Sequence, residues 1–323
     1  MKGAPLSQKK RVGVVRGGPS AEYDVSLKTG ARVLSLTIPG IEWKDILIDK
    51  HGMWYLNGVA QKPSTIFRNI DGIFNALHGT YGEDGSIQEI LDTFAVPYTG
   101  SGRMASALAM RKDLSGKRCA DSGIQVPFSL CVREGDAHTA VFHFVDRFPA
   151  PWVVKPAGTG SSVGVSLVYD KSELVNALEH AFEYGSAVLV EEYIEGKEAT
   201  CGVIEGVRGE DLYPLFPVEI IPRDASFFDY SAKYEGGTTE RCPGNFSEEE
   251  KLKLQELALS AHQCLGLRHY SRSDFIIHPD RGIFLLEVNA LPGLTEGSLL
   301  PLELDAAGIS FEEFIESLVR RAI

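Results

Sequence analysis

The sequence predicts a protein of mixed α/β and α+β class, and three observations lead to this expectation. Strand-like runs at residues 11–15, 44–48 and 72–76 precede a helical apolar repeat at 86–94, an alternation typical of an α/β unit. From residue 128 onward, strand-like runs become more frequent than before. The length of 323 residues allows two or three domains, each with its own hydrophobic core.

The first domain is expected at residues 1–102, as an open α/β sheet. Ser86 and Glu89 have the spacing of a capping box at the start of the helix at 86–94. Glycine and serine at residues 99–102 interrupt the helical pattern, which resumes at 105–121. We therefore place the first domain boundary at this interruption.

A small central α+β domain is expected at residues 103–191. Apolar runs predict strands at 152–155, 165–168 and 187–191. A helix capped by Ser172 is expected between the last two strands.

A larger α+β domain is expected at residues 192–323. Capping boxes predict helix starts at Ser247 with Glu250 and at Ser310 with Glu313. A long irregular segment at 222–246 has the length of a functional loop. Strands are expected at 198–204, 211–218, 273–277 and 283–287, and the last two form a hairpin.

Composition argues against several classes of function. Lysine and arginine number 32 against 44 aspartates and glutamates, so the formal charge of −12 argues against nucleic acid as a partner. No apolar stretch reaches the roughly 18 residues needed to cross a membrane. The five cysteines include no CxxC pair, so the sequence predicts a reducing, cytoplasmic location rather than a disulfide framework.

A glycine-rich loop follows the predicted strand that ends at Lys155. The sequence KPAGTGSSVG at 155–164 offers backbone N–H groups and a lysine charge, which together can hold phosphate oxygens. It matches neither a Walker A motif nor a GxGxxG motif. Taken alone, the loop is equally typical of a flexible hairpin.

Acidic and amide side chains lie on both strands of the predicted C-terminal hairpin. Strand alternation places Arg272 and Asp274 on one face, and likewise Glu287 and Asn289. Two carboxylates and an amide oxygen form a set that suits Mg²⁺ bound to nucleotide phosphates. The alternative is a solvated hairpin face with a surface ion pair.

Two further turns carry candidate binding groups. The turn at 289–298 presents the Gly293 amide and the Ser298 hydroxyl to a carboxylate or an oxyanion, or is simply a Pro-Gly turn before a helix. Glu22 follows the first strand, where open α/β sheets bind ligands, and could hold a substrate ammonium. It could equally be an acid that interacts with a helix N-terminus.

These motifs occur in one order along nearly the whole chain. They are GGPSAEYDVS at 17–26, ALHG at 76–79, GEDG at 82–85, PYTGSG at 97–102, MRK at 110–112, VKP at 154–156, GSSVG at 160–164, FDYSAKY at 228–234, RSD at 272–274 and LEVNALPG at 286–293. The ordered set resembles the ATP-grasp ligases, and within them the D-alanine:D-alanine ligase family. The resemblance implies an ATP-grasp fold preceded by an open α/β domain.

The resemblance also implies a role for each motif. ATP is expected between the central and C-terminal domains, and two Mg²⁺ ions, for which Mn²⁺ can substitute, on Asp274, Glu287 and Asn289. The first amino acid is expected at Glu22, with His78 nearby and Ser161 and Tyr234 linked to Glu22. Arg272, Gly293 and Ser298 are expected at the second substrate's carboxylate and the developing oxyanion. The residues expected to contact ATP are Lys112, Lys155, Gly160, Ser161, Ser162, Glu191, Glu198 and Lys233.

The implied reaction joins two D-alanines through a D-alanyl phosphate for peptidoglycan synthesis in the cytoplasm, by an enzyme expected to be a homodimer. The segment at 222–246, with Lys233 and Tyr234, is expected to act as a lid that excludes water. The chain has Pro19 and Ala290 where the family often has threonine, and neither position is a proposed ligand.

Two alternatives remain open at this stage. One is an ATP-grasp ligase with another second substrate, such as D-serine. The other is a catalytically silent nucleotide-binding scaffold, which should have lost a metal ligand or the lysine at 233, whereas this chain keeps both.

Overall fold

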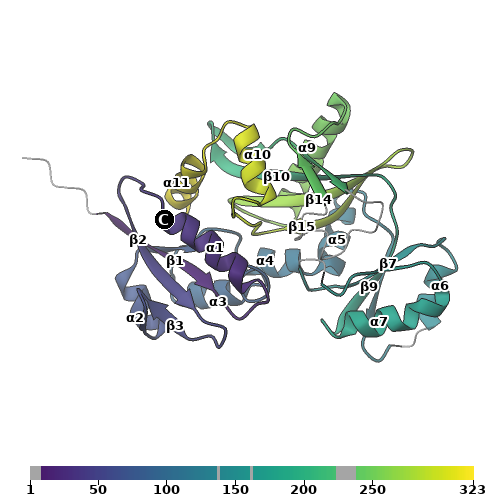
Figure 1. Ribbon diagram of the computed structural model, residues 1–323, viewed down its shortest axis with the longest axis horizontal. Helices are drawn as coiled ribbons and strands as arrows, with labels where there is room; N and C mark the ends of the chain where they lie inside the picture. Colours follow the sequence, from purple (N-terminus) through teal and green to yellow (C-terminus); the bar gives the residue numbers. More distant parts are fainter. Residues whose placement is uncertain (1–8, 137–138, 161–162, 223–237) are drawn as a thin grey trace, which may run out of the picture.

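The computed structural model describes residues 9–136, 139–160, 163–222 and 238–323. Its strands form three β-sheets, of five, four and six strands, in three lobes (Figure 1). We propose that the domain boundaries expected from the sequence separate these three sheets to within one residue, because the last strand of the central sheet ends at Glu192. Among the described helices, none combines the length and the apolar character needed to cross a bilayer.

The N-terminal sheet has the strand order β4-β3-β2-β1-β5. The three predicted strands are confirmed as β1 (Lys10–Gly17), β2 (Ile41–Ile48) and β5 (Gly72–Asn75), which run parallel. The valines of β1 are fully buried, as expected for a parallel strand covered on both faces. The remaining elements are β3 (Trp54–Leu56), β4 (Val59–Ala60), α1 (Tyr23–Leu34), α2 (Pro63–Ile66), the 3₁₀ helix η1 (Phe67–Asn69) and α3 (Ser86–Thr93).

Helix α3 is confirmed, but the predicted capping box at Ser86 and Glu89 is wrong. The N-cap is Gly85, whose φ of 94° is in the left-handed region that glycine adopts without steric cost. The Ser86 N–H donates to Asp84 Oδ1 over 2.9 Å, so Asp84 supplies the acceptor. Glu89 instead pairs with Arg103, at 3.1 Å.

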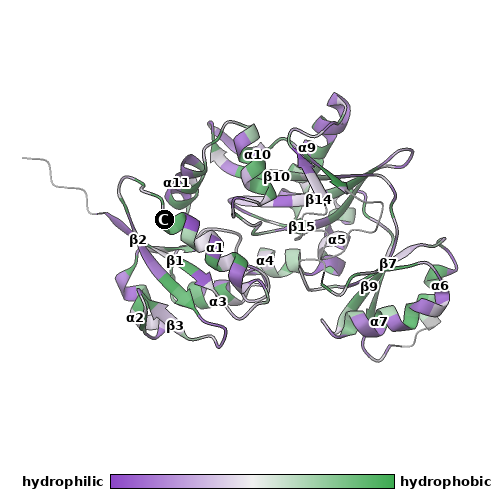
Figure 2. Cartoon of the chain, viewed as in Figure 1, coloured by the Kyte–Doolittle hydropathy of each residue, from purple (hydrophilic) through white to green (hydrophobic). Residues whose placement is uncertain are grey.

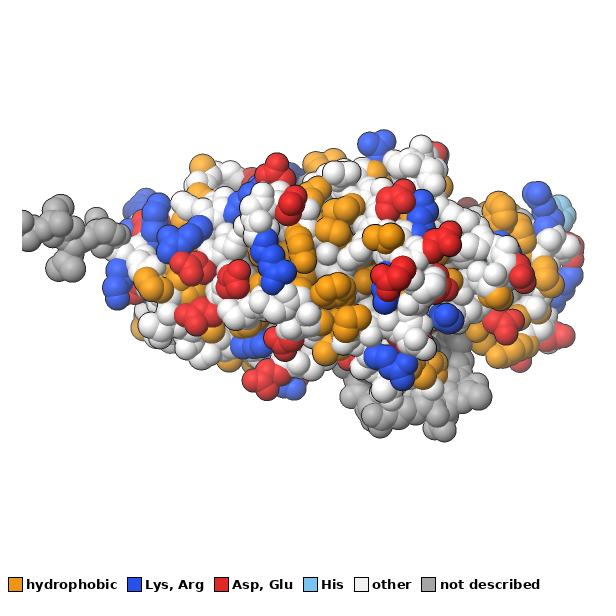
Figure 3. Space-filling view, turned by 90° about the horizontal axis from the view of Figure 1, so that it is seen from above, with side chains coloured by type: hydrophobic (Ala, Val, Ile, Leu, Met, Phe, Trp, Pro, Cys, Tyr) orange, Lys and Arg blue, Asp and Glu red, His pale blue; other side chains and the backbone are white. Residues whose placement is uncertain are grey.

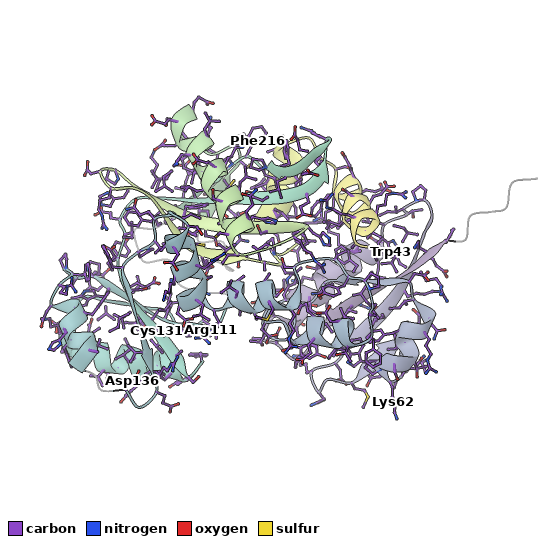
Figure 4. All side chains as sticks on the ribbon, turned by 180° about the vertical axis from the view of Figure 1, so that it is seen from behind. Trp43, Lys62, Arg111, Cys131, Asp136 and Phe216 are labelled. Carbon is purple, nitrogen blue, oxygen red and sulfur yellow. The ribbon has the colours of Figure 1, made fainter. Side chains whose placement is uncertain are left out.

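The single helix expected at 105–121 is two helices, α4 (Arg103–Met110) and α5 (Lys112–Asp121). Arg111 separates them because its ψ of 93° is extended rather than helical. Figure 4 labels Arg111 and Cys131, whose side chains both contact Asp113, at 2.6 Å and 3.7 Å. The break makes Lys112 the first residue of α5.

The central sheet has the order β6-β9-β7-β8, and its predicted strands are confirmed. The helix expected after Ser172 is present, but its cap is wrong: Asp170 forms the capping box with Glu173 and accepts from the Ser172 N–H. The elements are β6 (Ser129–Arg133), α6 (Thr139–Val145), β7 (Trp152–Pro156), β8 (Ser166–Val168), η2 (Lys171–Glu173), α7 (Leu174–Phe182) and β9 (Ala187–Glu192).

The C-terminal sheet has the order β13-β12-β10-β14-β15, with β11 also paired to β10. The strand expected at 211–218 is wrong as one element, because β11 (Glu210–Pro214) and β12 (Val218–Pro222) are separate. Pro214 and Pro217, which lack an N–H donor, flank the break. The segment expected to be irregular contains β13 (Thr238–Arg241) in its described part. The other strands are β10 (Lys197–Val207), β14 (Tyr270–His278) and β15 (Gly282–Asn289), and the last two form the predicted hairpin.

In the described part of this lobe, the helices are α9 (Glu248–Cys264), α10 (Leu299–Ala306) and α11 (Phe311–Ala322). The capping box of Ser247 with Glu250 is confirmed, and at α11 the Ser310 hydroxyl accepts from the Glu313 N–H. Figure 2 shows much of α10 coloured as hydrophobic and α11 largely hydrophilic on its visible side.

Helix α11 also joins the C-terminal lobe to the N-terminal sheet. Phe314 and Leu318 of α11 belong to the same buried cluster as Val12, Val14 and Phe74 of the first sheet. Figure 1 accordingly shows the C-terminus beside that sheet. On the face seen in Figure 3, basic and acidic side chains are interspersed among apolar ones.

Candidate active site

Two adjoining cavities lie where the three lobes meet. The larger, of about 530 Å³, is lined by strands of the central and C-terminal sheets. The smaller, of about 330 Å³, lies between the N-terminal unit and the turn before α10. Lys112, Gly160 and Glu287 line both cavities, so a group bound in one can reach a group bound in the other.

The larger cavity combines an apolar wall with charged groups, a combination typical of sites that bind a nucleotide base and its phosphates. Val153 and Leu167 of the central sheet and Ile276 and Leu286 of the C-terminal sheet supply apolar surface. Its charged and glycine residues include most of those predicted to contact ATP, namely Lys112, Lys155, Gly160, Glu191 and Glu198.

Lys155 and Glu191 form a buried ion pair within this cavity. Their Nζ and Oε2 atoms are 2.7 Å apart, and each side chain is about one-tenth exposed. The register of β7 and β9 explains the contact: Val153 pairs with Glu191, so Lys155 is a diagonal neighbour on the same face. The lysine charge is therefore held at the cavity wall before any anion binds.

The predicted hairpin brings the carboxylates together as expected. Asp274 pairs with Glu287 across the β14–β15 ladder, and Arg272 pairs with Asn289. Arg272 donates two parallel hydrogen bonds to Asp274, each of 2.9 Å, and Asn289 Nδ2 donates to Asp274 over 3.2 Å. Burial disfavours the charge of Arg272, but the adjacent Asp274 raises the arginine pKa above its ordinary value.

These oxygens fit a magnesium ion, which prefers carboxylate and amide ligands and completes its shell with phosphates and water. Among the described residues, no cluster of three His, Cys, Asp or Glu side chains forms a separate metal site. The candidate ligands are thus two facing carboxylates and one amide, rather than a complete protein cage.

Lys112 lies beside this hairpin because α5 begins there. Its Nζ is 3.0 Å from Glu287 Oε2 and donates to the Thr159 carbonyl over 2.7 Å. The lysine therefore connects the glycine-rich loop to the last strand of the C-terminal sheet.

The smaller cavity contains the residues predicted to bind the amino-acid substrates: Glu22, His78, Arg272, Gly293 and Ser298. Ser20 connects the first two, because its hydroxyl donates to the His78 carbonyl over 2.6 Å and accepts from the Glu22 N–H over 3.1 Å. A Cβ at Gly160 would lie 3.2 Å from Glu22 Oε1, so the glycine-rich loop reaches this carboxylate.

At the other end of this cavity, Gly293 lies against Ser298. A Cβ at Gly293 would lie 2.9 Å from Ser298 Oγ, so glycine permits this close approach. Ser298 is the N-cap of α10, and its hydroxyl lies 2.8 Å from Thr295 Oγ1.

The sequence analysis did not predict several side chains that contact the predicted site residues or their neighbours. Thr29 Oγ1 lies 2.9 Å from His78 Nε2, and Glu83 accepts from the Gly79 N–H over 2.7 Å. Burial raises the pKa of Glu83 above its usual range, although the neighbouring His78 opposes this rise. The Thr200 hydroxyl donates to Asp274 over 2.5 Å. Thr200 lies two residues after the predicted site residue Glu198, and strand alternation places both on one face of β10, so the sequence could have indicated it. The predicted residues Ser161, Ser162, Lys233 and Tyr234 lie outside the described residues.

Comparison with known protein families agrees with the order of these motifs. A model of the C-terminus of D-ala D-ala ligases matches residues 119–320, and a model of their N-terminus matches residues 57–101. The D-alanine–D-alanine ligase of Trichlorobacter lovleyi is 40% identical over 317 residues, which cover 96% of this chain and 94% of that protein.

Solved structures agree over nearly the full length. The VanG D-Ala:D-Ser ligase of Enterococcus faecalis has a TM-score of 0.86 at 30% identity, covering 98% of this chain and 100% of that one. The D-alanine–D-alanine ligase of Bacillus anthracis in complex with ATP has a TM-score of 0.80 at 31% identity, covering 97% of each chain. The chain described here belongs to the D-alanine–D-alanine ligase family, with the ATP-grasp fold.

Proposed function

We infer that this chain is an ADP-forming ligase that joins two D-alanines, through a D-alanyl phosphate, for peptidoglycan synthesis. The observation that carries this conclusion is the wall shared by the two cavities. Lys112, Gly160 and Glu287 line both, so a phosphate in the larger cavity can meet a carboxylate in the smaller one.

In the first step, a carboxylate oxygen of one D-alanine attacks the γ-phosphorus of ATP, and ADP leaves. Both reactants are anions, so positive charge must lie between them. We assign this role to Lys112 and Lys155, which are fixed by Glu287 and Glu191, and to Lys233 on the basis of its motif. Glu22 would hold the ammonium group of this first D-alanine.

We assign metal binding to Asp274, Glu287 and Asn289. Bound Mg²⁺ would align the terminal phosphates and offset their charge. The finer expectations of two ions, with Mn²⁺ as a substitute, are part of the proposal. Titration of ADP-bound protein with Mg²⁺ in a calorimeter would give the number of ions.

In the second step, the amine of the other D-alanine attacks the acyl carbon, the C–N bond forms, and phosphate leaves as the amine loses its proton. The tetrahedral intermediate carries an oxyanion, which Arg272 and the Gly293 N–H are assigned to stabilise. Loss of one such donor typically slows a reaction by about 10²–10³-fold. Ser298, beside Gly293, would contact the carboxylate of the second D-alanine.

The decisive experiment measures ADP release with D-alanine, L-alanine or D-serine, alone and in pairs, and identifies the product by mass. We expect ADP formation that depends on D-alanine, with D-alanyl-D-alanine as the main product. A D-alanyl-D-serine product from mixed substrates would favour the other ligase class, and ATP binding without turnover would favour a scaffold.

A homodimer and a cytoplasmic location also belong to this proposal. Sedimentation velocity tests the homodimer, and cell fractionation tests the location.

A further inference from the structure

Glu303 of α10 is a fully buried acid that none of the assigned roles uses. Its side chain has 0% exposure. Oε1 accepts a hydrogen bond of 2.7 Å from the Gly202 N–H, whereas Oε2 has no hydrogen-bond partner in the described part of the chain. A buried carboxyl is costly unless its surroundings compensate it, so its neighbours need to be identified.

The position of Glu303 follows from a gap beside β10. Strand β12 pairs with β10 as far as Thr200, and β11 pairs with it from Val203 onward. Gly202 lies in the gap, where its carbonyl accepts from the Leu215 N–H over 2.8 Å and its N–H donates to Glu303. The carboxyl group thus replaces a missing strand neighbour and attaches α10 to the centre of the sheet.

The same geometry places Glu303 beside Arg272. Gly202 and Arg272 are paired across β10 and β14, and side chains of directly paired residues project from the same face. A Cβ at Gly202 would lie 2.7 Å from Glu303 Oε2, so the carboxyl occupies the space that a side chain there would fill. Because both polar groups of Gly202 point away from β14, this pair is of the non-hydrogen-bonded kind, in which side chains are closest.

Arg272 therefore contacts one acid directly and has a second acid across the neighbouring strand. Asp274 binds its guanidinium through two hydrogen bonds, and Glu303 lies over the neighbouring strand. Burial raises the pKa of Glu303 to about 8, an effect that Arg272 opposes, and Glu303 in turn raises the pKa of Arg272. The two groups thus interact, in addition to the contact of Glu303 with the backbone.

We propose that Glu303 is a positioning residue that holds Arg272 and the start of α10 in register for the second substrate. Helix α10 begins after Ser298, and both Ser298 and Arg272 line the smaller cavity. Glu303 attaches this helix to β10 at the level of Arg272, so it fixes the separation of two groups that must act on one ligand. The inference rests on the proposed ligase function.

The test compares Glu303→Gln with Leu304→Ala in the full-length protein. The assays run at pH 9, above the pKa of about 8 of Glu303, so that its carboxyl is ionised. Glutamine then keeps an acceptor for Gly202 and nearly the same volume but removes the charge near Arg272. We expect kcat/KM for the second D-alanine to fall about tenfold while the thermal midpoint stays at or above that of the wild type. Leu304 is a buried neighbour in the same helix, and its truncation should lower the midpoint but leave kcat/KM within about twofold at a temperature where the variant is folded.

A double-mutant cycle separates positioning from a structural role. The effect of Glu303→Gln is measured again in an Arg272→Lys background, by single turnover with excess enzyme. If Glu303 acts through Arg272, the effect falls to within about twofold in that background. An unchanged effect there, or wild-type kcat/KM in Glu303→Gln, overturns the inference while the ligase assignment stands. If the wild-type chain itself forms no ADP with D-alanine, the function fails, and this inference fails with it.

Discussion

The ammonium group of Lys112 lies 3.0 Å from the Glu287 carboxylate, which joins the first residue of α5 to the second strand of the β14–β15 hairpin. This contact depends on the helix break at Arg111, because a continuous helix would not begin at Lys112. Both side chains line the two cavities. Their pairing places a positive charge next to a candidate metal ligand, at the point where phosphate and substrate carboxylate must meet.

Lys112→Gln should weaken the use of ATP without unfolding the protein. The substitution removes the charge that offsets the phosphates and leaves Glu287 without its ammonium partner. We expect KM for ATP to rise and kcat to fall, with kcat/KM lower by about 10²-fold. Lys117→Gln is the matched control, because Lys117 is an exposed lysine of the same helix. Equal losses in the two variants would show that Lys112 has no special role.

Glu287→Gln should increase the requirement for magnesium. The amide keeps one oxygen but loses the negative charge that attracts a divalent cation. We expect the Mg²⁺ concentration that gives half-maximal ADP formation to rise at least about tenfold, and EDTA to abolish activity in both proteins. Glu256→Gln, at an exposed position on α9, controls for the loss of one charge. An unchanged magnesium dependence would remove Glu287 from the set of ligands.

Gly160→Ala should impair the first substrate site, whereas Gly158→Ala should not. A methyl group at Gly160 would lie 3.2 Å from Glu22 Oε1, closer than most real Cβ contacts. At Gly158 its nearest neighbour would be Arg111 Cδ at 3.6 Å, an ordinary contact. Kinetics at saturating ATP should show a raised KM for the first D-alanine in the Gly160 variant only. The same change in both variants would indicate a general effect on the loop.

The hairpin and its acidic pairs could be predicted from the sequence because strand alternation and a polar turn are local signals. The helix starts at Gly85 and Asp170 could not be placed correctly. Gly85 and Asp170 are the N-caps, whereas the sequence predicted Ser86 and Ser172. A serine suits both the N-cap and the first turn of a helix, so its presence does not fix where the helix begins. Family resemblance predicted the site residues, but it gave no account of the groups that hold them in place.

The contacts behind the site depend on tertiary structure that local patterns do not encode. Thr29 meets His78 across 49 positions of sequence, and Glu303 meets Gly202 across 101. Glu303 lies at a buried position of α10, where binary patterning predicts an apolar residue. The gap between β11 and β12 leaves the Gly202 N–H available to that acid, whereas the sequence pattern predicted one continuous strand there.

His269 should make a contribution to stability that is lost in mild acid, above the pH at which an ordinary carboxylate titrates. Its imidazole is 5% exposed, and Nδ1 accepts from the Gly100 N–H over 2.9 Å. Burial, together with the adjacent Arg268, lowers the pKa of His269 to about 4. The unfolded chain therefore takes up a proton near pH 6.5, whereas the folded chain does so only near pH 4.

The sign of the effect follows from this difference: the contribution of His269 to the free energy of unfolding is greatest above pH 6.5 and falls as the pH drops toward 4. Glu303, whose folded-state pKa is about 8, contributes in the opposite direction over this range, so the His269 contribution is read from the difference between the wild type and a His269 variant. Between pH 7 and pH 5 the loss of stability attributable to His269 is about 2 kcal/mol, measurable by urea denaturation.

His269→Asn should remove this contribution, because asparagine does not titrate. Asparagine also tolerates the positive φ of 70° and can still accept from the Gly100 N–H. His51→Asn, at an exposed histidine, should leave the slope unchanged. The measurements stay above pH 5 because Glu205 loses its own stabilising contribution at lower pH. Burial would raise the pKa of Glu205, but its contacts with His262, His269 and Arg321 outweigh burial and lower this pKa to about 2. Identical slopes for wild type and His269→Asn would mean that His269 is protonated in the folded protein.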